Sequence, residues 1–552
     1  MGLGCMRLST APDRDAERAL ATVTCALDLG FAWLDTARAY AFDDGELGHN
    51  ERLLAAAIRA HSHQPKIISK GGMRRPAGAW RPDGRAGALE ADCDASLDAL
   101  GGLPIDLYML HVPDPAVPFS TSVRALKRLL DRGLVRAIGV SNVSRAELVE
   151  AMDLAPISAI EVALGPHADH ALKGGVIAHA VRSGLRVFAH APLGGAKKKR
   201  HPLIAKLAPE GVTAEELTLS ALARIHPAIV PIPGATRPET VRSIARADAL
   251  ELRDEDRAAI DARFGWWRAL APAPEVPARP GEVVMIMGPQ GAGKSSHVAP
   301  WVERGYVRLN RDLRGGTLDA LHRALGAELD RPEPRVVLDN VYTTRAGRFE
   351  PLDRARKGRV GVRGIWLDTP RADLEINIVT RMLEKHGALL EPEALARSKD
   401  PALFAPTVVL RTVRELELPE LDEGFAAIER IPFTRRALLP GHIARAVAVE
   451  SSRRISMEAQ TWLLDGPPGP RLVFGWTPGR RALALDLGPD VTVMTCPHEG
   501  GPPRCWCRPP LPGLLLAFGA QAGVDWSRSA VRGTGPAHRA LAEALGAHHV
   551  GG

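Results

Sequence analysis

The first half of the chain repeats one pattern, in which a short apolar segment typical of a buried strand precedes an amphipathic stretch typical of a helix. Seven such strands are predicted: Phe31–Thr36, Lys66–Lys70, Ile105–His111, Val135–Ser141, Ala159–Val162, Leu185–His190 and Ala228–Ile232. The glycine-rich start, Gly2–Leu8, supplies an eighth. Alternation of this kind indicates a parallel sheet, and eight units over about 250 residues predict an α/β fold of the (β/α)8 TIM-barrel type.

The 552 residues are too many for one hydrophobic core, so several domains are expected. The proline-rich stretch Ala271–Pro280 cannot continue a helix or a strand ladder and marks a boundary. A second α/β block begins at Glu282, and the C-terminal part is rich in proline and glycine. The expected organisation is a barrel over residues 1–268, a linker over 269–281, a second α/β domain over 282–435 and a small α/β domain over 436–552.

The composition says more about the cellular environment of the protein than about its activity. A formal charge of +7 suits either an arginine-rich solvated surface or a polyanionic partner, and charge alone favours the solvated surface. The apolar stretches are short and interrupted, so no membrane span is expected, and the N-terminus has no secretory pattern. Six cysteines do not form a disulfide framework, which favours a reducing cytoplasm.

Four polar residues follow three neighbouring strands of the predicted barrel, at the ends where barrels place catalytic groups: Asp35, Tyr40, Lys70 and His111. Proton transfer to a substrate oxygen needs a proton donor. Tyr40 suits that role if Lys70 lowers the pKa of its phenol, while Asp35 holds Lys70 charged. His111 is expected to donate a hydrogen bond to the same oxygen.

The sequence motifs around these residues resemble those of the aldo-keto reductase family. LDTARAY, ISKGG, LYMLH, IGVSN and IPGA occur in the family's order, and the resemblance covers almost all of residues 1–265. It implies reduction of a small carbonyl substrate by NADPH, with Asp35, Tyr40, Lys70 and His111 as the catalytic set.

The same resemblance implies a set of cofactor contacts. Ser141 and Asn142 are expected to bind the nicotinamide carboxamide, with Glu161 standing where many members carry glutamine. The loop with Pro192, Leu193 and Gly194 is expected to cover the pyrophosphate. The 2′-phosphate is expected to meet four residues: Gly234, Ala235, Thr236 and Arg237. The chain departs from the family at Ser243 and Ile244, where many members carry a Glu-Asn pair near the adenine. The basic run Lys197–Arg200 is either a pyrophosphate clamp or a solvated loop.

A G-x-x-x-x-G-K-S motif follows the apolar strand Glu282–Met287 directly. Its glycines free backbone N–H groups for phosphate oxygens, Lys294 reaches the β- and γ-phosphates, and the Ser295 hydroxyl binds Mg²⁺. The predicted ATP contacts are Gly288, Gly291, Ala292, Gly293, Lys294, Ser295 and Ser296.

Three segments after this loop resemble polynucleotide kinases and related small-molecule kinases: Leu309–Asp312, Val336–Asn340 and Asn377–Arg381. The resemblance covers about residues 282–435 and implies Asp312 as the general base and Arg381 over the transferring phosphoryl group. Asp339-Asn340 alone is more typical of a turn. The acceptor is either a nucleic-acid 5′-hydroxyl or a small alcohol.

Four soft ligands lie within one C-terminal segment: Cys496, His498, Cys505 and Cys507. Their spacing suits structural zinc, and the alternative is a group of unrelated buried thiols. The segment resembles the zinc loop of haloacid-dehalogenase-type phosphatases. That family's chemistry does not carry over, because Pro509, Thr534 and His538 stand where the family has catalytic or Mg²⁺-binding residues. The nucleophile is missing too, since the nearest candidate, Asp465, lacks the first Asp of the family's Asp-x-Asp motif. A phosphatase remnant that binds zinc is predicted.

Two functions from different classes follow. The leading one is an NADPH-dependent carbonyl reductase fused to an ATP-dependent kinase. The alternative is a sensor, in which the barrel binds NADPH, turns over little and gates a kinase that acts on nucleic-acid ends.

Overall fold

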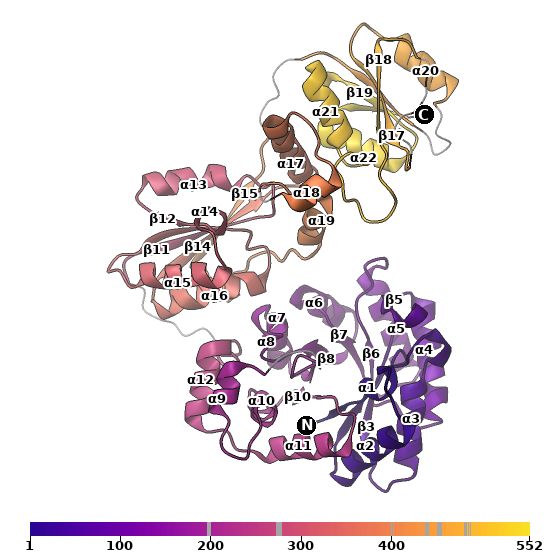
Figure 1. Cartoon of the computed structure of the whole chain (residues 1–552), viewed down its shortest axis with the longest axis vertical. Coiled ribbons are helices and arrows are strands. Elements are labelled where there is room, and N and C mark those ends of the chain that lie inside the picture. The colour runs from indigo at the N-terminus through magenta and orange to yellow at the C-terminus, as the bar shows by residue number, and fades with distance from the viewer. Residues whose placement is uncertain are drawn as a thin grey trace. The chain divides into compact units, whose positions relative to one another are not determined.

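The chain forms two compact units, Met1–Pro274 and Glu275–Gly552 (Figure 1). The computed structural model describes all residues except the following: 196–199, 272–278, 399, 401, 436–440, 450–454, 480–482, 484, 486 and 552. Most of the predicted linker, and Lys197–Lys199 of the basic run, lie outside the described residues.

The first unit is built on an eight-stranded parallel sheet, as predicted. In sheet order the strands are β1 (Leu3–Gly4), β2 (Trp33–Asp35), β3 (Lys66–Gly71), β6 (Leu107–Leu110), β7 (Ile138–Ser141), β8 (Ile157–Ala163), β9 (Arg186–His190) and β10 (Ile229–Pro231). The sheet closes on itself because the backbone N–H of Gly2 donates to the carbonyl of Pro231 at 3.0 Å, and that of Gly4 to Pro233 at 3.0 Å. A hairpin of β4 (Met73–Arg74) and β5 (Arg81–Pro82) follows β3.

Helices surround this barrel (Figure 1). They are α1 (Arg7–Thr10), α2 (Ala16–Asp28), α3 (His49–Arg59), α4 (Ala86–Leu100), α5 (Phe119–Asp131), α6 (Arg145–Leu154), α7 (His170–Lys173), α8 (Val176–Arg182), α9 (Pro202–Leu207), α10 (Ala214–Ala223), α11 (Pro238–Ala249) and α12 (Asp254–Phe264). Short 3-10 turns cover Asp44–Glu46 and Pro76–Gly78. The predicted first strand was too long, since only Leu3–Gly4 pairs and α1 begins at Arg7.

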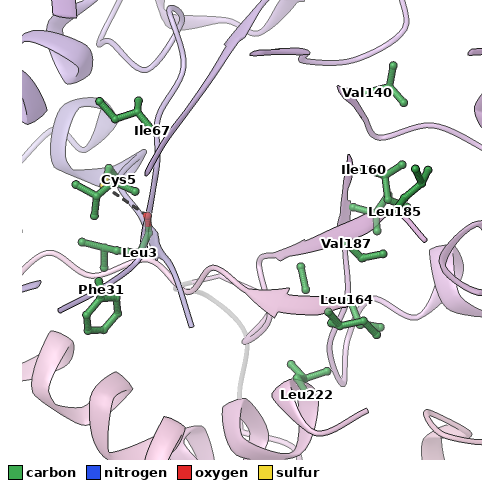
Figure 2. Packing of buried hydrophobic residues seen from close by; sticks show 14 of the residues in the cluster. Leu3, Cys5, Phe31, Ile67, Val140, Ile160, Leu164, Leu185, Val187 and Leu222 are labelled. Carbon is green, nitrogen blue, oxygen red and sulfur yellow. Dashed lines mark hydrogen bonds between the residues drawn. The ribbon is translucent and has the colours of Figure 1, made fainter. Parts of the chain in front are cut away.

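Side chains alternate across the strands and divide the apolar core in two. Figure 2 shows part of the outer layer, in which Leu3, Ile67 and Val187 pack toward the helices. The inner layer fills the barrel and includes Ile68, Leu107, Met109, Ala159, Phe188 and Ile232, with Trp33 packed against them. The barrel is therefore a filled core, and a functional site is expected at the strand ends above it.

The second unit contains two five-stranded parallel sheets. The first has the order β12 (Val307–Leu309), β13 (Arg335–Asp339), β11 (Glu282–Met287), β14 (Gly361–Asp368) and β15 (Ala427–Pro432). Its helices are α13 (Lys294–Glu303), α14 (Arg311–Arg314), α15 (Leu318–Leu329), α16 (Arg345–Lys357), α17 (Arg371–His386), α18 (Pro392–Arg397) and α19 (Pro406–Arg414), with a 3-10 turn at Leu421–Glu423.

The last sheet has the order β18 (Val491–Cys496), β17 (Arg471–Trp476), β16 (Arg445–Ala448), β19 (Ala530–Arg532) and β20 (His548–Val550). Its helices are α20 (Met457–Leu464), α21 (Gly513–Ala522) and α22 (Pro536–Leu545), with a 3-10 turn at Trp526–Arg528. Asp465 caps α20 and does not follow a strand. Among the described residues, no helix combines the length and the apolar character needed to cross a bilayer.

Each sheet of this unit has buried clusters of its own, and the cysteine-rich loop of the last sheet packs into a core of the first. Trp506 and Leu511, from the cysteine-rich loop, pack among buried residues of the first sheet such as Val284. The indole N–H of Trp506 donates to the carbonyl of Phe404 at 2.7 Å, and only 1% of this residue is exposed. Large buried aromatic side chains contribute strongly to stability, so this contact joins the loop firmly to the first sheet.

Candidate functional site

Five polar residues stand one step above the inner layer of the barrel, each two residues beyond one of its apolar side chains. Asp35 follows Trp33, Lys70 follows Ile68, His111 follows Met109, Glu161 follows Ala159 and His190 follows Phe188. Since residues two apart along a strand share a face, all five side chains point into the same end of the barrel.

Lys70 lies at the centre of this group and is fully buried. Its ammonium donates to Oδ1 of Asp35, to the carbonyl of Thr36 at 3.1 Å and to the phenol oxygen of Tyr40 at 3.2 Å. Oε2 of Glu161 lies 3.2 Å from the same Nζ. The structure thus brings together three of the four predicted catalytic residues, and it adds Glu161, which the sequence suggested only as a cofactor contact.

Burial governs the pKa values here. It raises the pKa of Asp35 to about 7, and the neighbouring charge of Glu161 adds to this while Lys70 opposes it. The pKa of Lys70 lies well above its usual value because the two carboxylates outweigh burial. The pKa of Tyr40 is raised by burial and by Asp35, against the influence of Lys70. The expected lowering of the phenol pKa is therefore wrong for the resting site, where Tyr40 keeps its proton.

His111 completes the predicted set from the end of β6. Its ring lies 5.6 Å from that of Tyr40, and both rings meet the indole of Trp80 edge-on. Burial, followed by the charge of Lys70, lowers the pKa of His111 well below its usual value, so the ring is neutral. Its Nδ1 has no hydrogen-bond partner among the described residues. Trp80 comes from the β4–β5 hairpin, where no strand pattern could have indicated it.

A cavity of about 480 Å³ opens beside these groups, and predicted catalytic and predicted cofactor residues line it together: Asp35, Tyr40, His111, Asn142, Glu161, Pro192, Leu193 and Gly234. Asn142 is held there with a φ of 58°, and its amide donates to Oγ of Ser141 at 3.0 Å and to the carbonyl of His111 at 3.1 Å. His190, also lining the cavity, donates to Oδ1 of Asn142 at 3.0 Å. His190 was not predicted as a site residue, although it ends a predicted strand just as His111 does.

The remaining predicted cofactor residues lie on two loops. Pro192 and Gly194 follow β9, and a side chain on Gly165 would meet the carbonyl of Pro192 at 2.2 Å, so that loop packs closely on its neighbour. Ala235 and Thr236 lead to Arg237, which is exposed and caps the N-terminus of α11. Free N–H groups at a helix N-terminus attract phosphate.

The departure from the family pattern at Ser243 and Ile244 has a packing explanation. Ile244 is buried in the outer core of the barrel. Ser243 donates to Oε1 of Glu216 at 2.8 Å, and Arg246 binds the same oxygen. Both positions therefore contribute to contacts within the barrel wall.

The glycine-rich loop of the second unit has the backbone that its motif predicts. Gly291 and Gly293 have φ values of 85° and 86°, in the left-handed region, and α13 begins at Lys294. A side chain on Gly291 would meet the carbonyl of Leu374 at 2.7 Å. Lys294 donates to the carbonyls of Gly288 and Pro289, each at 2.8 Å, while Ser295 and Ser296 are exposed at the start of the helix.

Three charged groups act on the Lys294 ammonium. Burial lowers its pKa to about 8, Asp339 and Asp312 oppose the change, and Arg381 adds to it. Asp312 and Arg381 are themselves exposed, on α14 and α17. Asp339 ends β13, the strand next to β11, and is 2% exposed. Since Arg308 and Asn310 both donate to it, its role extends beyond the turn suggested by the sequence.

The four C-terminal ligands converge, with all four donor atoms within 4.8 Å of one another. Sγ of Cys496 lies 3.6 Å from that of Cys505, and Nδ1 of His498 lies 3.2 Å from Sγ of Cys507. Tetrahedral zinc with sulfur ligands has edges of about 3.8 Å, so the donor set fits this metal. Nε2 of His498 contacts Glu391 at 2.8 Å, which leaves Nδ1 to face the other ligands.

The N-terminal half matches known proteins. The model of the aldo/keto reductase family matches residues 1–263. Aldo-keto reductase YhdN of Bacillus subtilis is 33% identical over 153 residues, which cover 27% of this chain and 44% of that protein. This chain thus spans less than half of that relative's length. An uncharacterized oxidoreductase of Schizosaccharomyces pombe is 25% identical over 269 residues. These cover 47% of this chain and 85% of that protein.

Solved structures also match about half of the chain. A thermostable aldo-keto reductase is 27% identical and has a TM-score of 0.42, covering 48% of this chain and 94% of its own. The holo form of an aldo-keto reductase from Bacillus halodurans is 22% identical with a TM-score of 0.41, covering 48% of this chain and 91% of its own. The family model spans every strand of the barrel, and residues 1–263 are therefore an aldo/keto reductase domain.

Proposed function

We propose that the N-terminal domain reduces an aldehyde or ketone with NADPH. The observation that carries this proposal is the contact of the buried Lys70 ammonium with both Asp35 and the Tyr40 phenol, at a cavity that His111 also lines. A phenol beside a buried cation is a proton donor whose conjugate base is stabilised at once.

Each residue of the site has a separate role in the proposed reaction. NADPH supplies the hydride when bound. Tyr40 donates its proton to the carbonyl oxygen, and Lys70 stabilises the phenolate that remains. Asp35 orients Lys70. His111 is neutral, so it donates a hydrogen bond to the substrate oxygen without adding a charge.

The cofactor residues suit NADPH in three respects. The Asn142 amide lines the cavity and donates to the carbonyl of His111 and to Oγ of Ser141, so it offers a polar partner for a carboxamide. Gly234, also in the cavity wall, carries no side chain that would block a pyrophosphate. Arg237, at the N-terminus of α11, offers a cation to a 2′-phosphate.

Replacing Tyr40 with phenylalanine tests this function. In the full-length chain we expect Tyr40→Phe to lower kcat by about 10²- to 10⁴-fold, measured by NADPH consumption with a panel of aldehydes, while NADPH binding changes little. The loss should be confined to the chemical step, because the phenol acts on the reacting oxygen. A variant that keeps most of its kcat contradicts the assignment. If wild-type protein binds NADPH but gives no oxidation in a single turnover, the sensor alternative is favoured.

For the second unit we propose ATP-dependent phosphorylation of a hydroxyl group, with Mg²⁺ held by Ser295. The supporting observation is that Lys294 begins α13 in a loop with two left-handed glycines while the buried Asp339 lies at the end of the adjacent strand. Acidic residues at that position bind Mg²⁺ in P-loop proteins. Asp312 is proposed as the base and Arg381 as the cation over the phosphoryl group.

The acceptor is decided by a direct assay. The full-length chain is incubated with labelled ATP and Mg²⁺, and either 5′-hydroxyl oligonucleotides or nucleosides are supplied. Label on the oligonucleotide alone assigns a nucleic-acid end, and label on nucleosides assigns a small alcohol. Transfer to neither, with no ATP bound, refutes the kinase proposal.

We also propose that Cys496, His498, Cys505 and Cys507 bind one structural zinc ion. Their donor atoms converge, and Glu391 holds the outer nitrogen of His498. Metal analysis of protein purified without chelator should find one zinc per chain, and its absence refutes the proposal.

A further inference from the structure

The second unit contains a cavity of about 1090 Å³ beside its glycine-rich loop. Gly291 and Gly293 of the loop and Ser296 of α13 form one edge of this cavity. Sites for small molecules commonly have volumes of about 300–1000 Å³. The cavity is therefore large enough for a ligand that extends well beyond the phosphates held by the loop.

The cavity lies on the side of the loop away from the groups proposed for phosphoryl transfer. Among the described residues that line it, neither Lys294 nor Asp312 nor Asp339 occurs. A nucleotide with its terminal phosphate at those three groups must place its base and ribose elsewhere. The cavity begins at Ser296, one residue after the proposed Mg²⁺ ligand Ser295, and so offers space for the nucleoside.

A second wall of the cavity comes from the domain of the last sheet. Leu516 and Ala520 of α21 line the cavity together with Trp526 and Leu545. This wall is packed against the first sheet's helices, since Ile376 of α17 contacts the apolar cluster that contains Trp526. The domain that resembles a phosphatase remnant thus shares one cavity with the glycine-rich loop.

Trp526 brings an unused hydrogen-bond donor to this wall. The residue is 3% exposed, and its indole Nε1 has no hydrogen-bond partner among the described residues. A side chain on Gly519, which also lines the cavity, would meet this nitrogen at 2.6 Å. A buried N–H group without an acceptor is costly, and an acceptor on a bound ligand removes that cost. Purine bases carry ring-nitrogen acceptors of this kind.

Another side of the cavity is held in place by an ion pair. Nε of Arg435 donates to Oδ1 of Asp373 in the first turn of α17, and both residues line the cavity. Phe433, half-buried and two residues before Arg435, lines it as well. The cavity therefore has an aromatic residue from each domain, Phe433 and Trp526, which suits a flat aromatic ligand.

We propose that this cavity binds the base and ribose of the nucleotide whose phosphates the glycine-rich loop holds, and that the C-terminal domain supplies a wall for the base through α21 and Trp526. This inference rests on the proposed ATP-dependent phosphorylation for the identity of the ligand. It gives the C-terminal domain a role in nucleotide binding that needs no phosphatase chemistry. The zinc loop supports this role by carrying Trp506, which packs into a core of the first sheet.

Filling the cavity from the side of α21 tests the proposal. Ala520 is exposed and lines the cavity, so Ala520→Trp adds bulk there without disturbing a buried core. In the full-length chain with Mg²⁺, titration calorimetry should show ATP binding weakened by about 10- to 100-fold. Binding of inorganic tripolyphosphate, which has no base, should stay as in wild type. The matched control is Gln521→Trp, because Gln521 is the next residue of α21, is exposed and is not one of the described residues that line the cavity.

A second variant, Trp526→Phe, removes the indole N–H and keeps an aromatic ring at the wall. We expect ATP binding to weaken by about 3- to 10-fold, the range for one lost hydrogen bond. The Tm of the protein without nucleotide should change little, because the N–H has no partner there to lose. A purely structural role for Trp526 predicts the reverse, a lower Tm with unchanged ATP affinity.

The possible results separate this inference from the proposed kinase. Unchanged ATP affinity in both Ala520→Trp and Trp526→Phe overturns the proposal, and so does an equal loss of ATP and tripolyphosphate binding in Ala520→Trp. A higher KM for the accepting alcohol with a wild-type KM for ATP also overturns it, because the cavity then belongs to the acceptor. If both variants weaken ATP binding as expected but wild-type protein phosphorylates no acceptor, the kinase function fails and the nucleoside site stands. If wild-type protein binds no ATP, both fail.

Discussion

The two carboxylates beside Lys70 should substitute for each other in stabilising the barrel, and a double-mutant cycle measures this. In Asp35→Asn, Oε2 of Glu161 still lies 3.2 Å from the ammonium, and in Glu161→Gln the Asp35 contact remains. Each single variant should therefore cost less than about 1 kcal/mol at neutral pH, where Asp35 is close to its pKa. The double variant leaves a buried charge without a counter-ion, which costs about 3–5 kcal/mol.

For a domain of this size, that cost corresponds to a fall of roughly 6–20 °C in Tm, at about 2–4 °C per kcal/mol. The assay is calorimetry of the full-length chain, in which the transition of the second unit serves as an internal control and should not move. The interaction free energy between the two substitutions should then exceed about 1 kcal/mol. Additive losses, or a single Asp35→Asn variant that already costs as much as the double variant, would refute the reasoning, because Glu161 would then not compensate Lys70.

Three further predictions concern the other sites. Arg237→Ala should weaken NADPH binding by roughly 10- to 100-fold and NADH binding much less, because only NADPH offers a 2′-phosphate to a charged donor; fluorescence titration of both cofactors checks this, and equal losses count against the role. Asp312→Asn should keep ATP binding but lose phosphoryl transfer, whereas Lys294→Ala should lose transfer through missing charge stabilisation; wild-type transfer by Asp312→Asn would reduce Asp312 to a structural residue. Glu391→Gln should lower zinc affinity by about 10- to 100-fold in a chelator competition, since it releases the outer nitrogen of His498, and unchanged affinity would show that this contact does not tune the metal.

Features that depend on a few consecutive residues could be predicted from the sequence. The strand and helix periodicity predicted the barrel, because each unit carries its own pattern of burial. Asp35, Lys70 and His111 were found because they end strands, and the glycine loop before Lys294 because its backbone requirements are local. The four cysteine and histidine ligands lie within twelve residues of one another, so their spacing alone indicated a metal site.

Contacts between distant segments were decided only by the tertiary structure. Glu161 lies in β8 and Lys70 in β3, and these strands are not neighbours in the sheet, so only closure of the barrel brings their side chains to 3.2 Å. The same closure buries Tyr40, which raises its phenol pKa where the residue types alone suggested a lower one. Glu391 reaches His498 across more than a hundred residues. Periodicity reports which face of its own strand a residue occupies, whereas the charge, burial and proton content of a site depend on what other strands place opposite it.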